Sequence, residues 1–275
     1  MKAHIVATLR NLRARRCGGY RFSKSYDDFE SALADSHGYE DCGVVRLVSV
    51  GTQSLRRHLA FDELKTTTDR HTLQGAFVVS QLDSEKQLNV LEIGGACGAL
   101  YFEIMHLLPR SIRKWHVVET PAMAEMGRKM FQDDKLKFFE DLDSAASGFL
   151  PDLVIAQSVL QYTPNPIHTW QTLLAVGADH AYIARTAVGV DIERPVVTRQ
   201  VCMLSMHGPG SAPEGFDDRI TSQPVVLVTA ESFAESASGY RLEYFFNEGN
   251  VEAYAIGSRL VKTRSVGFLF NKVGS

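Results

Sequence analysis

The 275-residue chain lacks several features that would assign it to a specialised class of protein. It has only four cysteines, at positions 17, 42, 97 and 202, with no CxxC pair, and its nine histidines are scattered. These spacings exclude a disulfide framework and give no metal-ligand pattern, so we predict a protein without a metal site. Few cysteines without a framework fit a reducing compartment such as the cytoplasm.

The sequence also lacks a long apolar run. Its longest uncharged stretch, residues 153–178, contains Pro164, Pro166 and several amide side chains, which argues against a membrane-spanning helix. The short apolar run from His4 ends at Arg10, so the N-terminus has no secretory signal core. We therefore expect a cytoplasmic protein.

An excess of positive charge is missing too. The formal net charge is −3, which disfavours a dedicated nucleic-acid binder. The first 24 residues hold seven basic and no acidic side chains, leaving 22 basic against 32 acidic residues in the rest. Residues 4–16 resemble a short amphipathic helix, compatible with weak contact with the inner face of an anionic membrane. A solvated helix or a partner-facing arm is the alternative interpretation.

From residue 89 onward, short β-rich runs alternate with helical patterns. This alternation predicts an α/β fold with a Rossmann-like, doubly wound, mostly parallel sheet. The predicted strands are 89–94, 115–120, 137–141, 152–158, 181–186, 241–247 and 265–272.

Two segments fall outside this alternation. Residues 1–70 form a predicted helical N-terminal extension, with helices at 26–35 and 54–64, that would be a substrate cap or an interaction arm of the domain at 71–275. Residues 187–228 are rich in glycine and proline, which predicts a long lid-like insertion without regular structure.

The most informative motif is a glycine loop between a predicted strand and a helix. It contains Gly94, Gly95, Ala96 and Gly98, and Glu92 precedes it on the strand. Such a loop brings backbone N–H groups to a ligand at a helix N-terminus. A dinucleotide fingerprint would need glycine at 96 and 99, where alanine stands. The pattern acid-x-Gly-x-x-x-Gly fits S-adenosylmethionine better.

Acidic residues end the next two predicted strands. Glu119 follows the second strand and is placed to accept hydrogen bonds from ribose hydroxyls. Asp141, or the backbone of Leu142, lies after the third strand, where it could meet the amino group of an adenine ring. A solvated strand-end acid, or a surface acid pair formed with Glu140, is the alternative.

These residues, together with the fourth-strand block Asp152–Tyr162, resemble the successive motifs of class I S-adenosylmethionine-dependent methyltransferases over residues 71–275. The resemblance implies a seven-stranded sheet whose last strand runs antiparallel, in a hairpin with strand 241–247. It also implies that Thr120, Gln157 and Ser158 contact the cofactor. Segments 19–39, 160–162, 185–186 and 219–223 are similar to a methyltransferase family associated with bacterial surface-polysaccharide genes. That similarity implies O-methylation of a sugar or polysaccharide precursor, with S-adenosylhomocysteine as the second product.

Three residues are candidates for handling the acceptor. His207, in the glycine- and proline-rich segment, would be a general base because its pKa suits proton transfer near neutral pH. Tyr162, after the fourth strand, would orient the acceptor. Arg185, ending the fifth strand, would anchor a phosphate or carboxylate of a phosphorylated acceptor.

Two other functions remain open at this stage. A catalytically silent S-adenosylmethionine-binding or scaffold protein would share the same loop, and no side chain stands out as an obligatory base. An NAD-dependent oxidoreductase is disfavoured by the alanines at 96 and 99. The oligomeric state is not encoded in any of these motifs.

Overall fold

The computed structural model describes residues 21–61, 69–82, 86–209 and 216–274. The basic segment at 4–16 and part of the lid-like insertion lie outside these ranges. Within the described residues, no helix is both long and apolar enough to cross a membrane.

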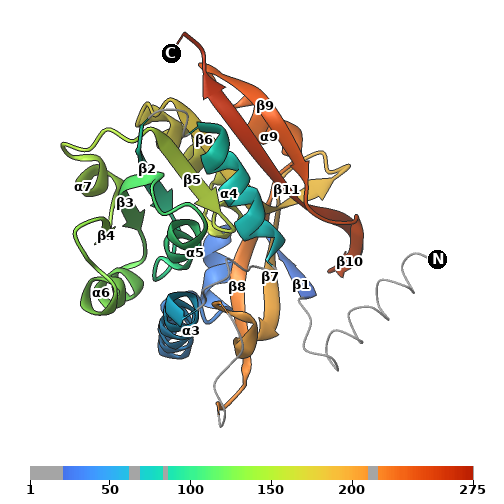
Figure 1. The fold of residues 1–275 in the computed structure, drawn as a ribbon. Helices are drawn as coiled ribbons and strands as arrows, with labels where there is room; N and C mark the ends of the chain where they lie inside the picture. Colours follow the sequence, from blue (N-terminus) through green and yellow to red (C-terminus); the bar gives the residue numbers. More distant parts are fainter. Residues whose placement is uncertain (1–20, 62–68, 83–85, 210–215, 275) are drawn as a thin grey trace.

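The main sheet confirms the predicted fold class. Its parallel strands follow the order β4-β3-β2-β5-β6, and β11 is antiparallel to β6. The bounds are β2 Leu88–Ile93, β3 Ile112–Val118, β4 Leu136–Phe139, β5 Leu153–Gln157, β6 His180–Val190, β9 Tyr240–Asn247, β10 Glu252–Ile256 and β11 Arg259–Lys272. Both β9 and β10 pair with β11. The predicted antiparallel last strand is therefore correct, but the direct hairpin from β9 is interrupted by β10 (Figure 1).

Helices cover both faces of this sheet because neighbouring strand residues point in opposite directions. Val90 and Ile155 belong to one hydrophobic cluster, and their neighbours Leu91 and Val154 to the other. The first cluster takes in α3 (Cys42–Phe61), α4 (Arg70–Leu82), α5 (Ala99–Leu107) and α6 (Pro121–Met130). The second takes in α7 (Leu142–Ala146), α8 (Pro166–Ala175) and α9 (Ala230–Glu235).

A second sheet corrects two of the sequence-based expectations. The strands β1 (Arg21–Tyr26), β7 (Val196–Met203) and β8 (Ile220–Leu227) form an antiparallel sheet in the order β1-β7-β8. The insertion at 187–228 is therefore largely β-structure, because its valine-rich ends outweigh the glycines and prolines between them. The N-terminal extension contains β1 as well as α2 (Phe29–Ala34) and α3, so it is not wholly helical.

The pairing of β1 with β7 joins the extension to the insertion. Figure 1 shows the three strands side by side below the main sheet, near α3. Their cluster includes Phe22, Val225 and Tyr254, the last from β10 of the main sheet. The extension and the insertion therefore form one structural unit that packs against the end of the main sheet.

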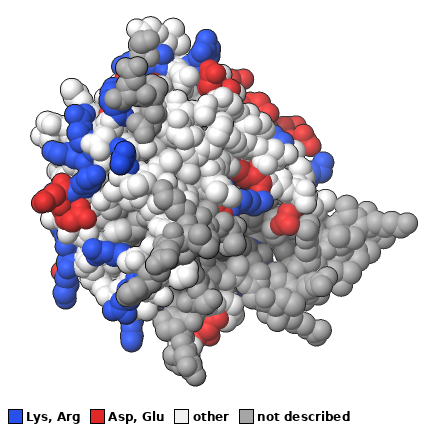
Figure 2. Space-filling view, in the orientation of Figure 1, with Lys and Arg blue, Asp and Glu red and all other residues white. Residues whose placement is uncertain are grey.

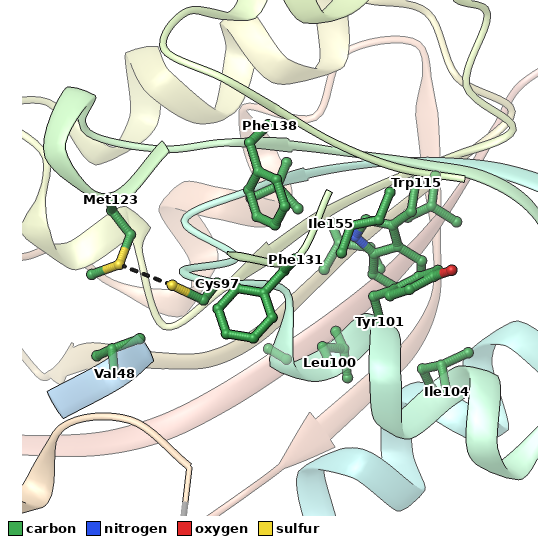
Figure 3. Packing of buried hydrophobic residues seen from close by; sticks show 14 of the residues in the cluster. Val48, Cys97, Leu100, Tyr101, Ile104, Trp115, Met123, Phe131, Phe138 and Ile155 are labelled. Atoms are coloured by element: carbon green, nitrogen blue, oxygen red, sulfur yellow. Dashed lines mark hydrogen bonds between the residues drawn. The ribbon is translucent and has the colours of Figure 1, made fainter. Parts of the chain in front are cut away.

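The core under the glycine loop is densely filled. Cys97 is fully buried, and its thiol lies 3.6 Å from the sulfur of Met123 (Figure 3). Burial raises the pKa of the Cys97 thiol to about 12, so this thiol is an inert packing group at neutral pH.

Candidate functional site

The glycine loop adopts a backbone conformation that favours glycine and other small residues. Gly94, Ala96 and Gly98 have φ angles of 71°, 50° and 80°, in the left-handed region that favours glycine. A Cβ on Gly94 would lie 2.5 Å from the side chain of Val159. Ala96 accepts this conformation at a cost of roughly 1–2 kcal/mol, and its N–H donates to Glu119 Oε1 at 2.9 Å.

Two carboxylates lie against this loop. Glu92 is only 2% exposed, lies beneath Gly95, and accepts a hydrogen bond of 2.9 Å from Trp115 Nε1. Glu119 accepts from the N–H groups of Ala96 and Thr120, each at 2.9 Å. Burial raises the pKa of both carboxyls, that of Glu92 to about 8, with the charge of Glu119 adding to the effect. Among the described residues, neither carboxylate is paired with a basic side chain.

Unpartnered polar atoms surround the same place. Thr120 Oγ1 and Gln157 Oε1 are buried and have no hydrogen-bond partner among the described residues. Ser158 follows Gln157 with a φ of 55°, and its N–H donates to the carbonyl of Ala184 at 2.8 Å. Buried polar atoms normally have partners, so these atoms indicate a ligand that supplies them.

The predicted adenine contacts have structural partners of their own. Asp141 is exposed and caps α7, accepting from the N–H and Oγ of Ser144 at 2.8 and 2.9 Å. Glu140 pairs with Arg128 at 2.6 Å. Leu142 is half-buried against the second hydrophobic cluster. The adenine-binding role of Asp141 and Leu142 stays a prediction.

A pH titration tests the environment of Glu92. An acid whose pKa is raised on folding contributes stability that is fully present below its unfolded pKa, here 4.5, and is lost as the pH rises toward 8. We expect the ligand-free Glu92→Gln variant, which cannot ionise, to gain stability over the wild type between these two pH values. Melting temperatures of both proteins across this range measure the effect, and a pH-independent difference would contradict it.

A cavity of about 710 Å³ opens beside Ser158, beyond the end of β5 and alongside the middle of β6. Arg185 was predicted to end its strand, but β6 continues to Val190 because β11 pairs with it over that length. The wall of the cavity comes from β1, α4, the segment after β5, and strands β6, β7, β10 and β11. Tyr162 and Arg185 both line it. The structure therefore brings together two of the three predicted acceptor residues.

Each of these two residues is held by specific contacts. The Tyr162 hydroxyl donates to Gln200 Oε1 at 3.0 Å, and its ring packs edge-on against Tyr39. Arg185 has a φ of 53°, and its N–H donates to Glu248 Oε2 at 2.7 Å. The Arg185 side chain is exposed within the cavity wall.

His207 is not among the residues that line this cavity. Its Nε2 lies 3.3 Å from Cys202 Sγ and 3.5 Å from Gln223 Nε2, and its ring packs against Tyr39. Burial lowers the pKa of His207. The half-buried ring thus packs against Tyr39 in the turn that follows β7. The role of His207 as a general base stays a prediction.

Most residues of the cavity wall were not predicted, among them the charged or titratable Arg70, His71, Glu248 and Arg264. His71 Nε2 accepts from Arg70 Nε at 3.3 Å, and His71 Nδ1 faces Glu248 Oε1 at 3.8 Å. Burial, then the charge of Arg185, lowers the pKa of His71 to about 4. No local motif marks these residues, because they come from three distant parts of the chain.

Comparisons with known proteins gave matches only among solved structures. No family model matches the chain, and the curated proteins gave no match. The chain is similar to CalS10, an amino pentose methyltransferase from Micromonospora echinaspora, with 13% identity and a TM-score of 0.47 over 76% of this chain and 92% of that one. For a S-adenosylmethionine-dependent methyltransferase from Clostridium acetobutylicum, the identity is 9% and the TM-score 0.48, over 79% and 98% of the two chains. For DesVI from Streptomyces venezuelae, the identity is 14% and the TM-score 0.46, over 74% of this chain and 90% of that one. These are distant likenesses, and the fold assignment rests on strand order and direction.

Proposed function

We propose that this protein is an S-adenosylmethionine-dependent methyltransferase that methylates a hydroxyl group of a sugar or surface-polysaccharide precursor. One observation carries the proposal. Two carboxyl groups, the buried Glu92 and the half-buried Glu119, lie against a glycine loop at the ends of adjacent parallel strands. A ligand with a cationic amino group would favour the charged form of such carboxyl groups and so lower their raised pKa values, whereas the diphosphate of a dinucleotide would not.

The residues around the loop fit this cofactor. Glu92 and the loop backbone would hold its charged amino-acid end, and Glu119 retains lone pairs for ribose hydroxyls beyond its two backbone contacts. The unpartnered Thr120 Oγ1 and Gln157 Oε1 offer further acceptors. When bound, S-adenosylmethionine would supply a methyl group on a sulfonium.

The acceptor would lie in the cavity beside Ser158. Tyr162 and Gln200 would orient its hydroxyl groups, and His71 would take the proton of the reacting hydroxyl on Nε2. Since Arg70 donates to that nitrogen, the ring carries its proton on Nδ1, toward Glu248. Glu248 is thus placed to favour the tautomer with a free Nε2 and to stabilise the charged ring after proton transfer.

Calorimetric titration with S-adenosylhomocysteine, with NADH as the competing ligand, tests the cofactor assignment. We expect micromolar binding of S-adenosylhomocysteine and none of NADH, because a dinucleotide loop needs glycine at 96 and 99, where this chain has alanine. Binding of NADH alone would establish the oxidoreductase alternative. Binding of S-adenosylhomocysteine without any acceptor-dependent formation of it from S-adenosylmethionine would favour the silent binding protein.

A further inference from the structure

Three arginines converge on the acceptor cavity. We propose that the acceptor carries a phosphate or diphosphate group, which Arg70, Arg185 and Arg264 bind on the wall of the cavity. The statement that the bound molecule is the methyl acceptor rests on the proposed function. The anion site on the cavity wall does not depend on methyl transfer.

The three guanidinium groups come from α4, β6 and β11 and line one cavity. Surface arginines are commonly neutralised by nearby carboxylates, as Arg128 is by Glu140 in this chain. In the described part of the chain, no ion pair joins a carboxylate to Arg70, Arg185 or Arg264. Figure 2 shows several places on the visible surface where basic and acidic side chains lie side by side.

The acidic residues of the cavity wall are engaged with other partners. Glu248 is 4% exposed, and its Oε1 accepts from Gln74 Nε2 at 2.8 Å. Its Oε2 accepts from the Arg185 N–H at 2.7 Å and from Ser265 Oγ at 2.8 Å. Glu252 accepts from the hydroxyl of Tyr254. Within the described ranges, neither carboxylate forms an ion pair with the three arginines, so their guanidinium groups keep donors for a ligand, although Arg70 Nε already donates to His71.

Arg264 gives a second, independent sign of a missing anion. Its Nε is buried and has no hydrogen-bond partner among the described residues, while its guanidinium lies 5.4 Å from the centre of the Phe245 ring. An unsatisfied buried donor on a charged group is costly. A phosphate oxygen would satisfy it, since planar guanidinium groups bind phosphate in a bidentate manner.

Arg185 is held in place by its backbone. Its left-handed φ of 53° occurs where the pairing of β6 with β11 shifts register between Val266 and Phe268. Glu248 fixes this irregularity through the Arg185 N–H. Glu248 is thus a positioning residue for the anion site as well as for His71.

The number of arginines in the cavity wall indicates which class of anion the site would bind. A single carboxylate would neutralise one guanidinium and leave two, whereas a phosphate or diphosphate carries enough charge and oxygen atoms for all three. A cavity of about 710 Å³ also has room for a sugar attached to such a group. A nucleotide-linked sugar and a lipid-linked sugar phosphate both meet these requirements.

Anion binding would also prepare the proposed base. Arg185 and Arg70 contribute to the low pKa of His71, after burial, and Arg70 occupies His71 Nε2. A phosphate that draws Arg70 away frees this nitrogen, and its negative charge offsets the two arginines. The acceptor would therefore raise the basicity of the group that removes its proton.

Calorimetric titrations of the full chain saturated with S-adenosylhomocysteine test the site. The probes are inorganic pyrophosphate, UDP-glucose, a polyprenyl phosphate in detergent micelles, and uncharged methyl glucoside. We expect the phosphate-bearing probes to bind and methyl glucoside not to bind. The stronger of UDP-glucose and the polyprenyl phosphate identifies the source of the phosphate.

Variants then locate the binding. Arg185→Gln and Arg264→Gln should each weaken pyrophosphate binding by about 10- to 150-fold, as expected for hydrogen bonds to a charged group. Arg259→Gln, an exposed arginine on the same strand as Arg264 and outside the cavity wall, is the matched control and should bind as the wild type does. Unchanged binding in both cavity variants, or no binding of any phosphate-bearing probe, would overturn the proposal. Failure to bind S-adenosylhomocysteine would instead overturn the proposed function, and titrations without it would still measure the anion site.

Discussion

Replacing Glu119 with alanine should weaken S-adenosylhomocysteine binding by about 10- to 150-fold. The range corresponds to roughly 1.5–3 kcal/mol for hydrogen bonds to a charged group. Glu119 would accept from both ribose hydroxyls, and it also fixes the loop through the Ala96 N–H at 2.9 Å. The variant therefore loses both the ligand contact and the loop contact.

The matched control is Glu125→Ala, which removes an exposed carboxylate from α6. It lowers the negative charge by the same amount without touching the loop, so its affinity should stay within about twofold of the wild type. Calorimetry measures both affinities, and circular dichroism verifies that both variants fold. A folded Glu119→Ala protein with wild-type affinity would remove Glu119 from the cofactor site.

Replacing His71 with glutamine should lower kcat by about 10²- to 10⁴-fold, the usual contribution of a general base. Affinity for S-adenosylhomocysteine should change little, because His71 lines the acceptor cavity and not the glycine loop. His207→Gln is the control, since His207 is packed behind Tyr39 against Cys202. Its kcat should stay within a few-fold of the wild type.

The pH profile distinguishes a base from a packing residue. A base works only when it is neutral, so activity should fall as the pH drops below its pKa. The ratio kcat/KM reports the free enzyme, so its fall should lie near pH 4, the pKa of His71. Burial, then the charges of Arg185 and Arg70, lower this pKa, and the charge of Asp69 opposes them. The value of kcat reports the enzyme with its substrates bound. Its fall should lie at higher pH, because the negative charge of a bound anion counteracts the charges of Arg185 and Arg70 and raises the pKa of His71. A larger loss in His207→Gln than in His71→Gln would contradict this assignment.

The cofactor side of the site could be predicted because its signals are local. Glu92, the loop at 94–98 and Glu119 each follow or end a strand, and parallel strands bring their carboxyl ends to one edge of the sheet. The bounds of β2 to β5 and of β9 agree with the predicted strands to within three residues for the same reason, since short apolar runs between helical patterns mark them. The strand β11 begins six residues before its predicted start, and β1, β7, β8 and β10 were not predicted. The sequence could not show that Asp141 caps its own helix through Ser144.

Most of the cavity wall beside Ser158, apart from Tyr162 and Arg185, could not be predicted because its contacts are non-local. Arg21 in β1 pairs with Val201 in β7, although the two residues are far apart in the sequence. No periodicity in either segment predicts that these strands pair. His71 and Glu248 meet only after α4 and the segment following β9 have packed against β6. The contacts of His207 with Tyr39 and Cys202 could not be predicted for a related reason, since glycine and proline near it suggested an open loop.

The pairing of β1 with β7 has a consequence for the order in which the two halves of the site are built. β1 leaves the ribosome early, but its partner follows only after the strands that carry the glycine loop and Glu119 have been synthesised. Contacts between distant segments also form late in folding. The strands around the glycine loop can thus pair before the small sheet is complete, so the cavity beside Ser158 is the last part of the site to close.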